Sequence, residues 1–238
     1  MDIQTFNRYE EKYIVTEIQK QQIIKSCKCR CDFDPFCSEN NSYRIYNLYF
    51  DTKDNNVIRQ SISCKKFKEK LRMRCYKFPI LSDDMVFIEI KKKAFGRINK
   101  RRISLSRQEA FQLIDDGTQP HFDDYESQQV LAEINYFLQN NRVIPSYFIT
   151  YERMAMTFKN DNNIRITFDS DIVERNYNLH LDDDSGIKLL KPEQVLMEIK
   201  TDQNYPLWLV NTLSQHGVYS QSFSKVGAAY SVSLRGVK

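Results

Sequence analysis

Charged residues alternate with apolar residues along much of this chain, at the period of two that is typical of a β-strand. Between residues 66 and 76, every second position is basic or aromatic: Lys66, Lys68, Lys70, Arg72, Arg74 and Tyr76. The positions between them are mostly apolar: Phe67, Leu71, Met73 and Cys75. The pattern predicts a strand with one buried face and one unusually basic face.

The same alternation predicts further strands, separated by turn and cap residues. Strands are expected at residues 43–50, 65–78, 85–93, 98–105, 146–157, 163–169, 171–177, 195–201 and 222–234, besides an N-terminal strand with Arg8, Glu10 and Lys12 on one side. Capping boxes at Thr16 and Ser106 each predict the start of a helix. Other helices are expected after Asp51, at residues 126–138, and from Pro206 to Gly217. Residues 1–238 therefore form one predicted α+β domain, dominated by antiparallel strands.

The charged faces allow two interpretations. On a sheet with one face in water, alternation of buried apolar and exposed polar residues is ordinary. Against this, a Glu-x-Lys pattern occurs three times, beginning at Glu10, Glu89 and Glu198. Acids beside bases on one face provide both a cation site and an anion site, as phosphoryl transfer from a nucleotide requires. Several such strands predict a sheet that curls around a charged interior, which a polyanion would fill.

Composition narrows the classes of function. The chain has 238 residues and a net charge of +4, which is too small for a general nucleic-acid binder, so no nucleic-acid partner is expected. The sequence has no apolar run long enough to cross a membrane and no signal peptide, which predicts a cytoplasmic protein without a transmembrane segment. It contains neither a P-loop nor a dinucleotide-binding glycine motif.

Four of the six cysteines lie close together in the sequence: Cys27, Cys29, Cys31 and Cys37. Their irregular spacing lacks the paired CxxC motifs of a zinc ribbon, and no histidine lies nearby. We therefore expect free thiols and not a metal site.

Short blocks in a fixed order along the chain resemble those of one family. The blocks are Arg8–Tyr13, Leu48–Thr52, Lys70–Tyr76, Phe87–Lys91, Lys100–Arg102, Tyr151–Ala155, Arg165–Asp169, Leu196–Lys200 and Ser224–Lys225. Each block alone is weakly specific, but the ordered set resembles the VTC domain, the catalytic domain of the vacuolar transporter chaperone polyphosphate polymerases. The wider group is the CYTH-like triphosphate tunnel fold. That resemblance implies an antiparallel β-barrel with flanking helices, whose lumen binds triphosphate or polyphosphate with a divalent metal.

The resemblance also implies roles for individual residues. Six cations would act on the transferred phosphoryl group: Lys12, Arg72, Arg74, Lys91, Arg153 and Arg165. Other groups would bind the rest of the substrate: Arg8, Lys100, Arg102, Tyr151, Ser224 and Lys225. Glu198 would hold the metal, Mn²⁺ or Mg²⁺, with Glu10 and Glu89 as possible further ligands. A guanidinium contacts phosphate through two donors while lysine acts as a point charge, so a mixture suits a polyphosphate.

The function implied is a polyphosphate polymerase that transfers the terminal phosphoryl group of ATP to a growing chain. Two alternatives remain open: an inorganic or nucleoside triphosphatase, and a non-catalytic protein that binds polyphosphate or nucleotide. The tunnel triphosphatases open with Glu-x-Glu-x-Lys, whereas Arg8 replaces the first acid here, which favours the polymerase. The polymerases of eukaryotes also carry membrane helices, so a membrane-protein partner is a further possibility for this chain.

Overall fold

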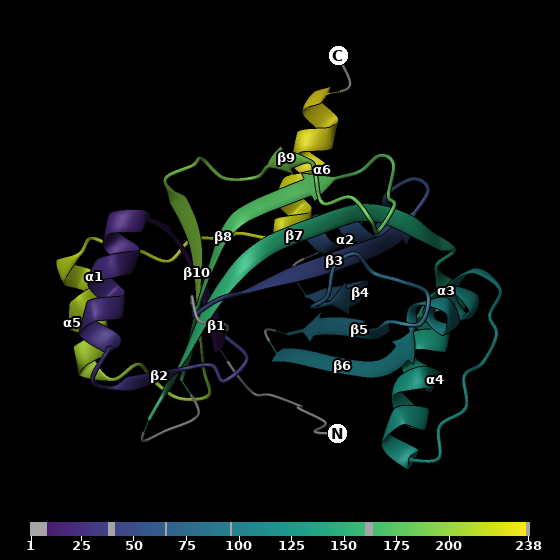
Figure 1. Cartoon of the computed structure of the whole chain (residues 1–238), viewed down its shortest axis with the longest axis horizontal. Coiled ribbons are helices and arrows are strands. Elements are labelled where there is room, and N and C mark those ends of the chain that lie inside the picture. The colour runs from purple at the N-terminus through teal and green to yellow at the C-terminus, as the bar shows by residue number, and fades with distance from the viewer. Residues whose placement is uncertain (1–8, 38–40, 65, 96, 160–163, 237–238) are drawn as a thin grey trace.

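The sheet predicted from the alternation forms the body of the molecule. The computed structural model describes residues 9–37, 41–64, 66–95, 97–159 and 164–236 (Figure 1). The strands are β1 (Tyr9–Thr16), β2 (Cys31–Phe33), β3 (Tyr43–Thr52), β4 (Phe67–Cys75), β5 (Met85–Ala94), β6 (Arg97–Ser106), β7 (Val143–Phe158), β8 (Arg165–Arg175), β9 (Ile187–Lys188) and β10 (Gln194–Thr201). The helices are α1 (Glu17–Cys27), α2 (Asn56–Ser63), α3 (Arg107–Asp115), α4 (Tyr125–Asn140), α5 (Leu207–Gln215) and α6 (Lys225–Gly236).

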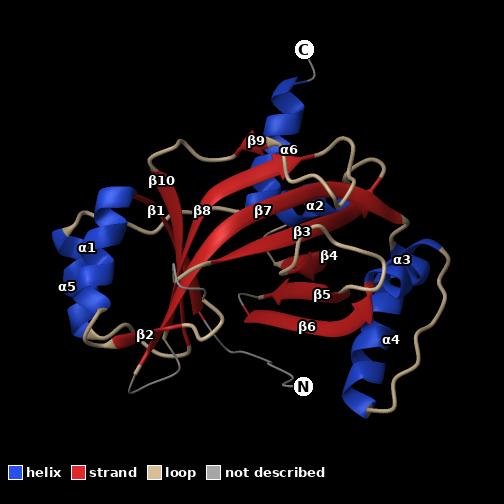
Figure 2. Ribbon diagram, viewed as in Figure 1, coloured by secondary structure: helices blue, strands red, loops and turns tan. Residues whose placement is uncertain are grey.

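All the pairings within this sheet are antiparallel, as predicted. The strand order is β1-β10-β8-β7-β3-β4-β5-β6, with β2 and β9 added to β7 and β8. Figure 2 shows the sheet curling so that β4, β5 and β6 lie beneath β3 and β7, while β1 and β10 stand at the other side. Strands β1 and β6 are the two ends of this order, so the ladder of hydrogen bonds in the described residues does not close into a complete barrel.

Helices cover the outer face of the sheet at both ends. At one end, α1 and α5 contribute Ile23, Leu209 and Leu213 to a buried cluster with the outward side chains of β1, β8 and β10. At the other, α3 and α4 pack on the outer face of β4, β5 and β6, where Ile88 and Ile103 are fully buried. The capping boxes at Thr16 and Ser106 are both formed, which confirms the predicted helix starts. These helices cover the apolar outer face of the sheet, whereas the opposite positions of the alternating strands, among them Glu89, Arg153 and Glu198, face the interior.

The prediction of a strand at residues 222–234 is wrong, because these residues form α6. The Ser224 hydroxyl accepts a hydrogen bond from the Gly227 N–H at 3.2 Å, which caps the first turn of the helix. Val226, Ala229 and Tyr230 then share one helical face and pack with inward residues of β3 and β7. The apolar residues of this segment thus form the buried side of a helix. This helix lies against the inner face of the sheet near α2 (Figure 1).

The other differences from the predicted elements are smaller. The strands expected at residues 163–169 and 171–177 form one strand, β8, with a register shift near Asp171, whose φ is +48°. Residue 163 lies outside the described part of the chain. The short strands β2 and β9 were not predicted, since two or three residues carry no readable period. Within the described residues, none of the helices combines the length and hydrophobicity required to cross a membrane.

Candidate functional site

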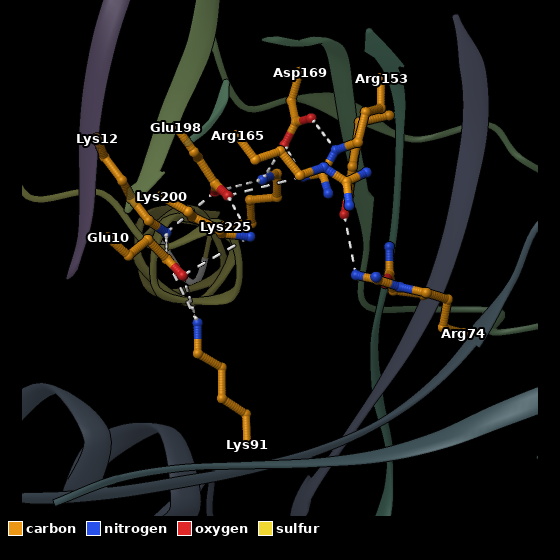
Figure 3. A network of polar contacts seen from close by, with 12 residues as sticks. Glu10, Lys12, Arg74, Lys91, Arg153, Arg165, Asp169, Glu198, Lys200 and Lys225 are labelled. Atoms are coloured by element: carbon orange, nitrogen blue, oxygen red, sulfur yellow. Dashed lines mark hydrogen bonds and ion pairs between the residues drawn. The ribbon is translucent and has the colours of Figure 1, made fainter. Parts of the chain in front are cut away.

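Clusters of acids and bases line the inner face of the sheet. Alternation places charged residues from β1, β4, β5, β6, β7, β8 and β10 on this side, and α6 adds Lys225. Figure 3 shows side chains from several of these elements converging on a common interior space. An ion pair between Lys91 Nζ and Glu10 Oε2 at 3.3 Å joins β5 to β1 across the interior. The end strand β1 is therefore connected through charged side chains to β5, the neighbour of the other end strand.

Glu198 on β10 is the centre of one cluster. Its Oε1 lies 3.3 Å from the ammonium groups of both Lys12 and Lys225. Lys200 is 3.7 Å away and Arg153 is 3.9 Å away. The residue is 5% exposed, and burial alone would raise its pKa. The surrounding cations, led by Lys12, instead hold the pKa of Glu198 well below its ordinary value, so it is a carboxylate at neutral pH.

Asp169 on β8 forms a second centre beside the first. Its carboxylate accepts two hydrogen bonds from the Arg153 guanidinium, at 2.6 and 2.7 Å, and pairs with Lys225. Lys225 therefore bridges Asp169 and Glu198 from the first turn of α6. A cation at the N-terminus of a helix is unfavourable toward the helix dipole, so these two carboxylates stabilise it there. The ordering of α6 and the ordering of this cluster are consequently linked.

Glu89 on β5 organises a separate cluster on the opposite wall. It is 1% exposed and pairs with Arg72 at 2.6 Å, with Lys100 at 2.7 Å and with Arg74 at 3.8 Å. Arg74 also donates to the Tyr151 hydroxyl at 3.3 Å, which connects this wall to β7. Burial would raise the pKa of Glu89, but Arg72, Arg74 and Lys100 hold it well below the ordinary value. One carboxylate thus faces three cations.

Cations outnumber acids along the inner face, and burial, with a smaller contribution from neighbouring cations, lowers the pKa of several of its lysines. Burial lowers the pKa of Lys100 to about 7, although Glu89 opposes this change. Burial also lowers the pKa of Lys70 and of Lys200 to about 8. Part of the population of these lysines is therefore neutral near pH 8 when no ligand is bound. An added polyanion would favour the protonated form of each lysine.

We expect the stability of the free protein to rise with pH above neutrality. The pKa of Lys100 is lower in the folded protein, about 7, than the ordinary 10.5 that applies to the unfolded chain. Between these values the unfolded chain binds more protons, so the free energy of unfolding increases with pH. A bound triphosphate should raise the lysine pKa values, so binding should take up protons.

Calorimetric titration of triphosphate at about pH 8, in buffers of different ionisation enthalpy, measures this uptake. Lys100→Met should reduce the number of protons taken up, whereas substitution of the outer-face Lys92 by Met should not. Binding without proton uptake would contradict the expectation.

The structure brings together most of the site residues predicted from the sequence. Lys12, Lys91, Arg153, Lys225, Glu10 and Glu198 lie in connected contacts, and Arg72, Arg74, Lys100 and Glu89 form the opposite wall, which Tyr151 of β7 joins through Arg74. Ser224 caps α6 and accepts a hydrogen bond from Lys70 at 3.0 Å. Arg165 pairs with Asp34, and the Arg102 guanidinium lies over the Phe87 ring. Arg8 lies outside the described residues.

The assignment from sequence omitted four residues that form contacts at this site: Asp34, Lys70, Asp169 and Lys200. Lys70 and Lys200 share the alternation of their assigned neighbours Arg72 and Glu198, so the period of two could have identified them. Asp169 likewise follows Arg165 and Thr167 at the same spacing. Asp34 belongs to no repeating pattern, and only the approach of the segment after β2 to Arg165 reveals its place.

The carboxylates of Glu10 and Glu198 both contact the ammonium group of Lys12, and this pair is the candidate for holding a metal. Lys12 Nζ lies 3.4 Å from Glu10 and 3.3 Å from Glu198. The described residues contain no group of three or more His, Cys, Asp or Glu that could hold a metal unaided. Mg²⁺, however, is commonly held by one or two carboxylates together with substrate phosphates. The pair therefore fits a Mn²⁺ or Mg²⁺ that binds with a phosphate ligand, whereas Glu89 lies in the separate cluster.

Comparison with known families identifies the class of protein that this fold and inner face define. The VTC domain model matches residues 7–234. The chain therefore belongs to the VTC domain family, as the ordered blocks predicted. Comparison with curated proteins finds no match in sequence.

Solved structures share the fold at low sequence identity. A candidate adenylate cyclase from Bacillus halodurans is 14% identical with a TM-score of 0.55, and the match covers 92% of this chain and 96% of that chain. A candidate adenylate cyclase from Vibrio parahaemolyticus is 12% identical with a TM-score of 0.48, covering 94% and 97%. The mimivirus capping enzyme triphosphatase is 11% identical with a TM-score of 0.34, covering 90% and 87%. The first of these likenesses concerns the fold, and it agrees with the predicted CYTH-like triphosphate tunnel fold.

Proposed function

We propose that this protein is a metal-dependent polyphosphate polymerase, which transfers the terminal phosphoryl group of ATP to the end of a polyphosphate chain. The observation that carries the proposal is the pair of facing charged walls. The Glu89 cluster lies on one wall and the Glu198 and Asp169 clusters lie on the other, with excess cations on both. A ligand that carries several phosphates can contact both walls at once and relieve the repulsion among their cations.

The walls suit phosphoryl transfer because this reaction depends mainly on positioning and on electrostatic stabilisation. The guanidinium groups of Arg72 and Arg74 on one wall and of Arg153 on the other are held on the inner face by contacts with Glu89, Tyr151 and Asp169. These groups would hold the oxygens of the transferred phosphoryl group, where negative charge is spread in the transition state. The acceptor is a chain-end phosphate that is already ionised. The protein therefore needs no strong general base to activate it.

The carboxylates of Glu198 and Glu10 would hold Mn²⁺ or Mg²⁺ together with phosphate oxygens. The bound ion would supply Lewis-acid neutralisation of the charge on the phosphates. Lys12 lies between the two carboxylates and would keep a phosphate contact beside them, while Lys91 would approach from β5. The same site would hydrolyse a triphosphate if water took the place of the chain-end acceptor.

Incubation with ATP, Mn²⁺ or Mg²⁺ and a short polyphosphate primer tests this proposal. We expect one ADP for each phosphate that is added to a chain, with free phosphate as a minor product. Gel staining measures the chains and a phosphate-release assay measures the free phosphate. Protein purified in the same way with Glu198→Gln controls for contaminating kinases. Stoichiometric free phosphate without chain growth would instead identify a triphosphatase. Binding of both ligands without any turnover would identify a binding protein.

A further inference from the structure

Three aromatic side chains gather beside the arginines of the two walls. Tyr43 comes from β3, Tyr76 directly follows β4, and Phe87 comes from β5. The rings of Tyr43 and Tyr76 have centroids 6.0 Å apart, tilted by 57°. The rings of Tyr76 and Phe87 are 6.1 Å apart and meet edge to face at 73°. The three residues, which we call the aromatic cluster, thus make one continuous set of ring contacts over three strands.

Strand register places the aromatic cluster next to the phosphate-binding wall. Tyr43 is directly opposite Arg153 in the β3–β7 pairing, and its hydroxyl accepts a hydrogen bond from Arg165 at 3.4 Å. Phe87 is directly opposite Arg74 in the β4–β5 pairing. Tyr76 lies just beyond the end of β4, and its ring contacts with Tyr43 and Phe87 place it on the same side of the sheet as those residues. The aromatic cluster therefore lies beside arginines that would hold a phosphate.

The aromatic cluster retains an accessible ring at this position. Tyr76 is 45% exposed, although two other aromatic rings lie within contact of it. Tyr43 and Phe87 are half-buried. The Arg102 guanidinium lies over the Phe87 ring at 4.4 Å from its centroid, so that ring already has a planar cation stacked on it. The planar, partly solvent-exposed ring of Tyr76 is the part of the cluster that a flat ligand could cover.

We propose that the aromatic cluster binds the nucleobase of a nucleoside triphosphate by stacking on Tyr76, while the arginines hold its phosphates. This inference rests on the proposed function in that it takes the charged walls as the phosphate site. It adds a separate subsite, which distinguishes a nucleoside triphosphate from inorganic triphosphate and from the end of a polyphosphate chain. Donor and acceptor polyanions could then share the same walls while only the donor contacts the aromatic rings.

Stacking predicts a particular kind of selectivity. An aromatic ring contacts the π-face that every base has and does not read the hydrogen-bonding edge. ATP and GTP should therefore bind with similar affinity. Pyrimidine nucleotides should bind more weakly, because their smaller ring covers less of Tyr76. The affinity for inorganic triphosphate should not depend on the side chain at position 76.

Titration calorimetry with ATP and with inorganic triphosphate, on the wild type and on Tyr76→Ala, tests the proposal. Because the base would lose its stacking partner, Tyr76→Ala should weaken ATP binding about tenfold, which corresponds to about 1.4 kcal/mol. Triphosphate binding should stay within about twofold, which corresponds to less than about 0.5 kcal/mol. Tyr76→Phe retains the ring and should restore ATP affinity. Tyr136→Ala, at an exposed tyrosine of α4, is the matched control and should change neither affinity.

Each outcome of the titrations supports or overturns the nucleobase subsite. An ATP affinity unchanged in Tyr76→Ala, with the wild type binding both ligands, overturns the nucleobase subsite and leaves the proposed function intact. Equal weakening of ATP and triphosphate also overturns it, because Tyr76 would then only shape the phosphate wall. If the wild type binds neither ligand, the proposed function and the subsite fail together. Thermal melting of each variant verifies that it is folded before titration.

Discussion

Substitution of Glu198 by Gln should reduce metal-dependent turnover about 100-fold or more, since even residues that only support a metal ligand contribute 10- to 100-fold. Gln preserves the shape of the side chain but removes the charge that would hold the cation. Triphosphate binding measured without metal should be unchanged or tighter, because Lys12 and Lys225 lose a shared counter-ion. Initial rates with varied Mn²⁺ concentration, together with metal-free calorimetry, measure the two effects separately.

The control for this variant is Glu193→Gln, which removes one carboxylate from an exposed residue just before β10. It should retain the turnover and the metal dependence of the wild type. A Glu198→Gln protein with wild-type turnover and unchanged metal dependence would contradict the assignment of the metal to this carboxylate. The same measurements on Glu10→Gln would then determine whether β1 supplies the ligand instead.

Substitution of Glu89 by Gln should destabilise the free protein by about 3 kcal/mol or more, since removal of one partner of a buried ion pair commonly costs this much. Glu89 is fully enclosed and faces Arg72, Arg74 and Lys100. Its loss leaves three neighbouring cations without their shared counter-ion. An added triphosphate supplies negative charge at the same place, so it should raise the melting temperature of the variant more than that of the wild type.

Glu133→Gln is the matched control for Glu89→Gln. Glu133 on α4 pairs with Lys92 and Arg101 on the outer face, where it is 28% exposed. Because these half-buried side chains are partly open to solvent, the loss of stability should be smaller than that for Glu89→Gln, and triphosphate should not compensate for it. If Glu89→Gln instead loses its metal dependence while its stability stays near that of the wild type, Glu89 is a metal ligand and not a counter-ion.

The two substitutions assign different tasks to carboxylates that look alike in sequence. Glu89 and Glu198 both begin a Glu-x-Lys pattern, and each is buried among cations. Glu198 differs because Glu10 lies across Lys12 from it, whereas Glu89 has three cations and no second acid among its ion-pair partners in the described residues. Only the distances between strands separate a carboxylate suited to a metal from one that acts as an internal counter-ion.

The C-terminal segment shows where local pattern misled the prediction. Val226 and Tyr230 lie among small and polar residues in an order that is compatible with alternation, so a strand was predicted. The cap at Ser224 and the packing of Val226, Ala229 and Tyr230 on the inner face favour a helix. A short segment commonly takes the conformation that buries its apolar residues best, because tertiary packing outweighs a weak local preference.

The sequence by itself determined which residues share a strand face, because alternation is a local consequence of the extended backbone. It also determined the capped starts of α1 and α3 and, through its ordered motifs, the family. Alternation is the same for charged-out and charged-in strands; the repeated Glu-x-Lys pattern favoured a charged interior, and the tertiary structure decided between the two. It likewise decided which acid pairs with which base. Contacts such as Lys91 with Glu10 and Lys225 with Asp169 join residues far apart in the chain, and their geometry depends on sheet curvature and strand register, which no local pattern contains.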